Sequence, residues 1–107
     1  MFKRTVCFAH YMNNHKFGYI GVLQNNYFIM NDTAQIEYYK GGIYGQSKVV
    51  WKNCNEYFLV VTKRNYEKGL RVGDTLYVKL LSLNNDTLTG LMSALNLTYK
   101  FQMIKIE

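Results

Sequence analysis

The sequence predicts an all-β fold, a small barrel in a single domain. Helical periodicity is nearly absent, whereas short runs rich in β-branched and aromatic residues recur between Asn, Asp and Gly residues. The chain has 107 residues, 49% of them hydrophobic, which is enough for one modest core without disulfide or metal support. Eight such runs in so short a chain favour a closed or partly open barrel, with no helix longer than about two turns.

The expected strands are separated by polar turns, since Asn and Asp tolerate positive φ and bond their own backbone. Hairpin turns are expected at Gln24–Asn26, Lys52–Asn55 and Asn84–Asp86, and an aromatic loop at Tyr38–Gly45. Arg71–Leu80 is typical of the start of a barrel strand, because its glycine permits a tight turn and its alternate Leu and Val point to one face. The eight expected strands are Arg4–Met12, Phe17–Leu23, Tyr27–Met30, Lys48–Trp51, Glu56–Thr62, Thr75–Leu83, Thr87–Met92 and Thr98–Ile106.

The chain is basic, and its positive charge is concentrated in the middle of the sequence. The net charge is +6 at pH 7, and residues 40–79 alone carry eight basic and three acidic side chains. Such a balance favours an anionic partner, most often nucleic acid. Lys63 and Arg64 are candidates for a phosphate clamp, and Lys52 follows the single tryptophan, Trp51. The alternative is a solvated basic surface that keeps the protein soluble.

The two cysteines are too few for a disulfide framework and lack metal-ligand spacing. Cys7 lies in an apolar run and is expected to be a small buried hydrophobe, whereas Cys54 is expected to be an exposed free thiol in a turn. The N-terminal residues contain no apolar run long enough for a signal peptide, and no segment approaches the length of a membrane span. These features predict a cytoplasmic protein that does not bind membranes.

Three stretches occur in an order that is typical of a known family. Residues 11–20 read Tyr-Met-Asn-Asn-His-Lys-Phe-Gly-Tyr-Ile, residues 27–36 read Tyr-Phe-Ile-Met-Asn-Asp-Thr-Ala-Gln-Ile, and residues 70–74 read Leu-Arg-Val-Gly-Asp. Together they resemble the cold-shock type of oligonucleotide-binding (OB) barrel, although a glycine is missing after Lys16 and Met30 replaces a histidine. The resemblance covers a little over half of the chain. It implies an OB-like barrel in which residues 37–69 form an inserted β-hairpin.

The resemblance also implies a binding platform. Phe17, Tyr19 and Phe28 would stack on bases, and Lys16 would approach phosphate. The spacing of Phe17 and Tyr19 places both rings on one face of a strand. Stacking of this kind is worth about 1–3 kcal/mol per base and tolerates any base. The alternative is that these aromatic rings fill the core of the barrel, and Trp51 has a similar alternative as a packing residue at a barrel end.

The sequence therefore predicts a protein that binds single-stranded DNA or RNA with low sequence specificity, without a cofactor. The alternative is a protein-binding inhibitor or accessory module of a mobile element, because the hairpin at residues 48–62 is apolar on both faces. An enzyme is not expected, since the chain has only two histidines and no paired acids with catalytic spacing, although a Cys–His pair is left open. The candidate nucleic-acid-binding residues are Lys16, Phe17, Tyr19, Phe28, Trp51, Lys52, Lys63 and Arg64.

Overall fold

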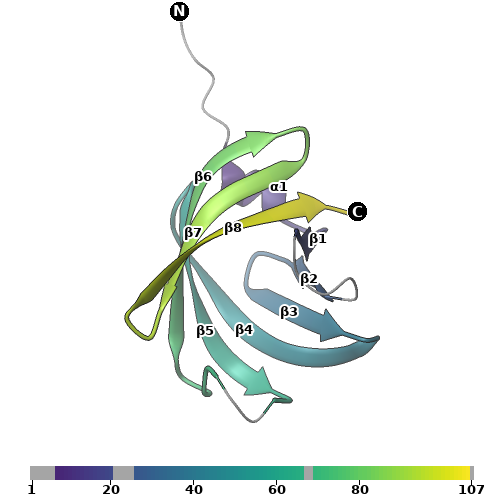
Figure 1. Ribbon diagram of the computed structural model, residues 1–107, viewed down its shortest axis with the longest axis vertical. Helices are drawn as coiled ribbons and strands as arrows, with labels where there is room; N and C mark the ends of the chain where they lie inside the picture. Colours follow the sequence, from purple (N-terminus) through teal and green to yellow (C-terminus); the bar gives the residue numbers. More distant parts are fainter. Residues whose placement is uncertain (1–6, 21–25, 67–68, 107) are drawn as a thin grey trace, which may run out of the picture.

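The fold consists of one short helix followed by eight strands, which confirms the all-β prediction (Figure 1). The structure is a computed structural model that describes residues 7–20, 26–66 and 69–106. Part of the expected turn at Gln24–Asn26 and the end of the expected strand at Phe17–Leu23 lie outside these residues. The elements are α1 Phe8–Met12, β1 His15–Tyr19, β2 Asn26–Met30, β3 Ala34–Tyr39, β4 Gly42–Asn53, β5 Glu56–Arg64, β6 Thr75–Asn84, β7 Thr87–Ala94 and β8 Leu97–Lys105.

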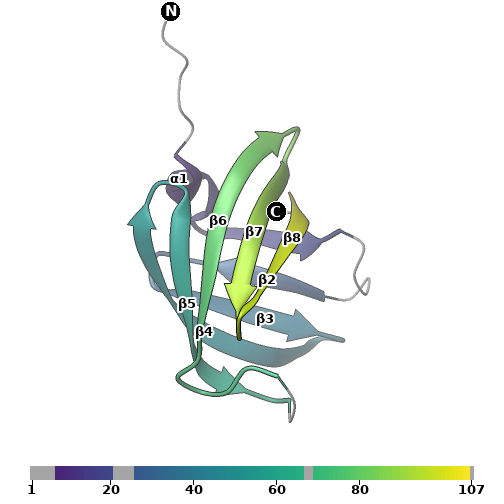
Figure 2. The same cartoon turned by 60° about the vertical axis from the view of Figure 1, so that its left-hand side comes forward.

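The strands close into an antiparallel barrel in which each strand pairs with its neighbours in sequence. β1 completes the ring by pairing with β8 (Figures 1 and 2). This order is up-and-down, whereas the OB fold is a five-stranded Greek-key barrel. The expected hairpin is confirmed, since Lys48 lies opposite Val60 and Trp51 lies opposite Tyr57. Its strands β4 and β5 both belong to the barrel wall, where they lie between β3 and β6.

Alternate residues of the strands point inward and form the core, as the period of two requires. The rings of Phe17 and Phe28 and the side chains of Val78 and Leu88 are fully buried there. Met12 of α1 is also fully buried, and Phe8 packs against the same core. The helix therefore covers one end of the barrel.

Connections between consecutive strands alternate between the two ends of an up-and-down barrel. Residues 31–33, 54–55 and 85–86 turn at the end covered by α1, which we call the α1 end. Lys40–Gly41, the described residues 65–66 and 69–74, and Leu95–Asn96 lie at the opposite end, which we call the far end. In Figure 2 the helix lies beside the β4–β5 turn, and the loop after β5 lies at the other end of the molecule. No helix in the described ranges is long and apolar enough to cross a membrane.

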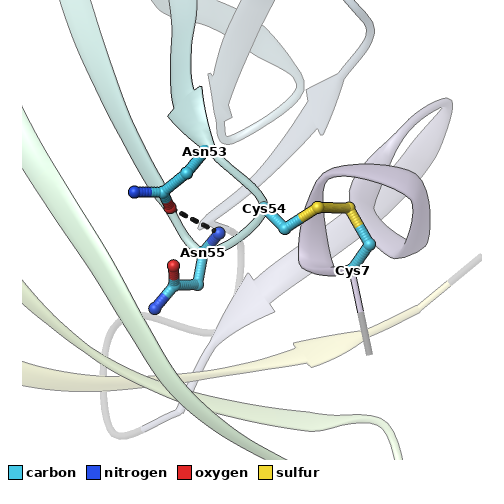
Figure 3. Close-up of a disulfide and its surroundings, with 4 residues drawn as sticks. All are labelled: Cys7, Asn53, Cys54 and Asn55. Carbon is cyan, nitrogen blue, oxygen red and sulfur yellow. Dashed lines mark hydrogen bonds between the residues drawn. A yellow bond between two sulfur atoms is a disulfide. The ribbon is translucent and has the colours of Figure 1, made fainter. Parts of the chain in front are cut away.

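The two cysteines form a disulfide, so the predictions of a free thiol at Cys54 and a small buried hydrophobe at Cys7 are wrong (Figure 3). The Cα atoms of Cys7 and Cys54 are 4.7 Å apart, although 47 residues separate them in sequence. They meet because the residues that lead into β1 and the turn between β4 and β5 both lie at the α1 end. The backbone N–H of Ala9 also donates to the carbonyl of Cys54 at 3.2 Å, which fixes the helix to this turn.

Two secondary-structure predictions are also wrong. The described part of the expected strand at Arg4–Met12 is the helix α1. The expected aromatic loop at Tyr38–Gly45 instead contains the end of β3 and the start of β4. Only a tight turn at Lys40 and Gly41 separates these strands, and both residues have positive φ, 50° and 80° respectively.

Candidate functional site

The expected stacking platform lies inside the barrel. Phe17 and Phe28 are 0% exposed, and their rings stack on each other with centroids 5.4 Å apart. Tyr19 follows them on the inner face and is partly buried, with its ring 5.4 Å from that of Phe28. The placement of Phe17 and Phe28 on an outer binding surface was therefore wrong. Their spacing identifies a shared face correctly, but that face is the core.

The other candidates on the α1 side of the barrel have local partners. Trp51 is partly buried, and its ring lies 4.6 Å from that of Tyr57, so it packs against the core. Lys52 forms an ion pair with Glu56 at 3.6 Å. Trp51 thus matches the packing alternative better than an exposed stacking residue.

Lys16 and the pair Lys63–Arg64 lie in different places. The ammonium group of Lys16 sits 4.0 Å from the centroid of the Tyr27 ring on the outer wall. Arg64 donates from Nη1 to the carbonyl of Leu70 at 3.1 Å, so its guanidinium group holds the far-end loop. Lys63 is exposed at the same end of β5, away from Trp51 and Lys52, which lie near the end of β4 at the α1 end. The eight candidate residues therefore do not form one surface.

The far end of the barrel contains a hollow of about 230 Å³ between β3, β4, β5 and the loop after β5. Glu37 of β3 lines it, and Gly45 of β4 lies directly opposite Glu37 in the strand register. Gly45 also lines the hollow and brings no side chain into it. A Cβ atom at Gly45 would lie 3.4 Å from Cε1 of Tyr66 and 3.6 Å from the carbonyl oxygen of Lys63, so a larger side chain there would crowd the Tyr66 ring and enter the hollow.

Glu37 places a carboxyl group on the inner face of β3. It accepts a hydrogen bond from Nε2 of Gln35 at 3.2 Å. Burial raises the pKa of Glu37, and the bond from Gln35 partly opposes this shift. Burial also raises the pKa values of Tyr19 and Tyr57, and the nearby charge of Glu37 raises both further. The carboxylate is therefore electrostatically coupled to the tyrosines of the barrel interior.

Gln35 adds a second polar group next to Glu37. Its side chain is only 1% exposed, and its Oε1 atom has no hydrogen-bond partner. The Oδ1 atom of Asn26, at the far-end start of β2, is likewise buried without a partner. Buried acceptors without a donor are uncommon in folded proteins, and each one needs an explanation. The interior of this barrel therefore has unused capacity to accept hydrogen bonds.

The hollow also has apolar and aromatic walls. Leu59 and Val61 of β5 are 2% and 5% exposed and form its floor together with Leu76. At the rim, the rings of Tyr44 and Tyr66 stack with centroids 4.6 Å apart. Burial raises the pKa of Tyr66, with a further contribution from the charge of Glu37.

Sequence reasoning missed Gln35, Glu37 and Gly45. The available signal was the alternation Gln35–Ile36–Glu37–Tyr38, in which two polar residues share one face of a strand and two apolar residues share the other. The usual rule assigns the apolar face to the core. Here the polar pair points inward, and Ile36 and Tyr38 lie on the outer wall opposite Ile29 and Tyr27.

The comparisons give no relative from which a function could be transferred. No protein-family model matches the chain, and no curated protein matches it either. Among the described residues, no three His, Cys, Asp or Glu side chains gather in a way that could hold a metal ion. The hollow and its polar groups are therefore interpreted from their own chemistry.

Proposed function

We propose that the protein binds a small molecule in the hollow at the far end of its barrel. The observation that supports this best is the hollow beside Glu37, which Gly45 lines from the opposite strand. Eight-stranded barrels have an interior just wide enough either to be filled by side chains or to hold one small ligand. In this barrel the α1 end is filled by Met12 and its neighbours, and the far end keeps the space.

Thermal unfolding with a panel of amino acids, amines, organic acids, sugars and nucleosides tests this function. A ligand at a hundred times its Kd stabilises the folded state by about 2.7 kcal/mol. For a domain of this size that raises Tm by roughly 10 °C. We expect at least one compound class to produce such a shift, because the hollow exists only in the folded barrel.

A pair of glycine variants provides the control. Gly45→Leu fills the hollow and should abolish the shift, whereas Gly42→Leu should preserve it. A Cβ atom at Gly42 meets only the carbonyl oxygen of Tyr39, at 3.8 Å. The proposal is wrong if no compound raises Tm, or if Gly45→Leu responds as the unmodified protein does.

The disulfide bears on where this function operates. Disulfides form and persist in oxidising environments and are rare in the cytosol. We infer that the protein works in an oxidising compartment, in contrast to the cytoplasmic location expected from the sequence. The Cys7–Cys54 disulfide is the observation that supports this inference.

Binding of single-stranded nucleic acid is a second candidate function, on the outer wall. Tyr27 and Tyr38 lie opposite each other on β2 and β3, and their rings stack with centroids 5.0 Å apart. Lys16 lies over the Tyr27 ring. Aromatic faces beside a cation suit the bases and phosphates of a single strand. The cold-shock resemblance predicts this function, but its stacking residues Phe17 and Phe28 lie in the core, so Tyr27 and Tyr38 would provide the aromatic faces.

A further inference from the structure

We propose that the hollow takes a free α-amino acid with an apolar side chain, its ammonium group bound by Glu37 and its carboxylate by Lys63. The inference rests on the proposed function, because it names the ligand class of the same hollow. It follows from three different walls, one anionic, one cationic and one apolar. An amino acid carries one group for each of them.

The anionic wall is Glu37. Within the described residues no Lys or Arg nitrogen lies within 4.0 Å of the Glu37 carboxylate. The ion pair among these residues is Lys52–Glu56, which does not involve Glu37. Its hydrogen bond to Gln35 comes from a neutral amide. A buried carboxylate is stabilised most by a cation that also donates hydrogen bonds. A primary ammonium group has three donors, enough for Glu37 and for a neighbouring acceptor such as the unpartnered Oε1 of Gln35.

The cationic wall is at the rim. Lys63 lines the hollow from β5, two residues beyond Val61. Its neighbour Arg64 is already bonded to the carbonyl of Leu70 and lies 5.8 Å from the centroid of the Tyr66 ring. Lys63, unlike Arg64, is exposed and can turn to a ligand. A ligand carboxylate at the rim would face Lys63 while its ammonium group faces Glu37.

The apolar wall determines the third part of the ligand, which is its side chain. Leu59, Val61 and Leu76 form it from β5 and β6, and Leu70 extends it toward the loop. The volume of about 230 Å³ is smaller than that of sites for drug-sized ligands, which begin at roughly 300 Å³. A branched aliphatic side chain matches this wall and this volume. We therefore take leucine as the probe.

Isothermal titration of the full chain with three related compounds tests the ligand class. The compounds are leucine, 3-methylbutylamine, which lacks the carboxylate, and 4-methylpentanoate, which lacks the ammonium group. We expect leucine to bind and each of the other two to bind at least about tenfold more weakly, because each loses one charge-assisted contact.

Two variants separate the roles of the charged residues. Glu37→Gln should weaken leucine and 3-methylbutylamine at least about tenfold and leave 4-methylpentanoate unchanged. Lys63→Ala should weaken leucine and 4-methylpentanoate and leave the amine unchanged. Gly45→Leu should abolish binding of all three, and Gly42→Leu should bind as the unmodified protein does.

The outcomes distinguish this inference from the function on which it rests. If the three compounds do not bind but others raise Tm in a manner abolished by Gly45→Leu, the amino-acid ligand is wrong and the small-molecule function stands. If the amine or the acid binds as tightly as leucine, the two-charge recognition is wrong. If nothing in either experiment binds, both proposals are wrong.

Discussion

Glu37 is a residue whose ionisation works against folding. Burial raises its pKa above the ordinary value of 4.5, because the charged carboxylate is less well solvated inside the barrel than in the unfolded chain. The folded state therefore binds this proton more readily than the unfolded state does. The free energy of unfolding therefore rises as pH falls through the pKa that Glu37 has in the folded state. This rise ends once the pH is below the pKa that Glu37 has in the unfolded chain. At neutral pH the ionised group lowers the free energy of unfolding.

Replacing this carboxyl group with an amide removes its pH dependence. We expect Glu37→Gln to raise Tm at neutral pH and to reduce the gain in Tm that the unmodified protein shows on mild acidification. Thermal unfolding followed by circular dichroism between neutral pH and about pH 4.5 measures both effects. Equal pH profiles for the two proteins would contradict the assignment of a buried, destabilising carboxylate.

Glu56 provides a matched control with the opposite sign. A hydrogen bond from Tyr77 is the main cause of its lowered pKa, with smaller contributions from Asn53, Lys52 and Lys79. The stabilisation from this carboxylate is present above its unfolded pKa and is lost as pH falls through the folded value. Glu56→Gln should therefore lower Tm at neutral pH and not raise it.

For single residues, the sequence predicted which side chains share one face of a strand. It did not predict whether that face points into the barrel or outward. A period of two places Phe17 with Tyr19, and Gln35 with Glu37, whatever surrounds the strand. Whether a face is inner or outer depends on barrel closure, which in turn depends on pairing between β1 and β8 at opposite ends of the chain. Polar residues on an inner face reverse the usual rule, so Gln35 and Glu37 could not be assigned to the interior from their residue types.

Among the elements, α1 depends most on its surroundings. It has only five residues, and no side chain caps its first turn. Isolated helices shorter than about 12–15 residues are marginal in water, so tertiary contacts must hold this one. Those contacts are the disulfide to Cys54, the bond from Ala9 to the same residue and the buried Met12. The helix is thus a cover fixed at one edge by a covalent bond.

Removing the disulfide should lower the stability of the whole barrel. For a closed loop of 47 residues the loss of chain entropy in the unfolded state corresponds to about 4 kcal/mol. We expect the double variant Cys7→Ser, Cys54→Ser to lose up to this amount of unfolding free energy. It should therefore unfold at a lower urea concentration than the unmodified protein does. Reduction of the unmodified protein should shift it to the same midpoint, and the double variant should not respond to reductant. Titration of free thiols in the oxidised protein should give none, and coincident unfolding curves would contradict the covalent tether.

The elements recovered from sequence are those with local signals. β5, β6, β7 and β8 are strand-like runs bounded by Asn- and Asp-containing turns, of which Asn85 and Asp86 have φ values of 48° and 66°. β3 and the start of β4 were missed because the glycines of Gly41–Gly45 read as a loop. α1 contains the aromatic residues Phe8 and Tyr11 and follows the β-branched Thr5 and Val6 in sequence. Local propensity therefore favoured a strand where the disulfide and the core hold a helix.

The molecule as a whole carries a net charge of +6, and Glu37, one of its acids, lines the hollow inside the barrel. Four acids have local partners, since Glu37 accepts from Gln35, Glu56 from Tyr77, Asp86 from Tyr11, and Asp74 from a backbone N–H. In the described ranges only Lys52 has a carboxylate within 4.0 Å. The other Lys and Arg side chains of these ranges have no ion-pair partner, and this excess of positive charge favours association with a polyanion.

Titration with a labelled oligothymidine at about 50 mM and 200 mM salt tests whether this charge serves the second candidate function. If it does, affinity falls steeply between the two concentrations, because each phosphate contact contributes about −0.7 to the logarithmic salt slope for a single strand. Tyr27→Ala and Tyr38→Ala should each cost about 1–3 kcal/mol of binding through a lost stacking contact. Lys16→Ala should instead reduce the salt slope by roughly one contact.

Phe58→Ala is the matched control for the tyrosine variants. Its ring lies on the outer wall beside Tyr77 of β6, 5.3 Å away between centroids, in a second aromatic pair that is not adjacent to Lys16. If Phe58→Ala weakens binding as much as Tyr27→Ala does, stacking is not located on β2 and β3. If no binding is measurable at the lower salt concentration, the outer wall does not bind single strands. Its positive charge then has the role that the sequence left open, that of a solvated surface around a barrel whose binding site is inside.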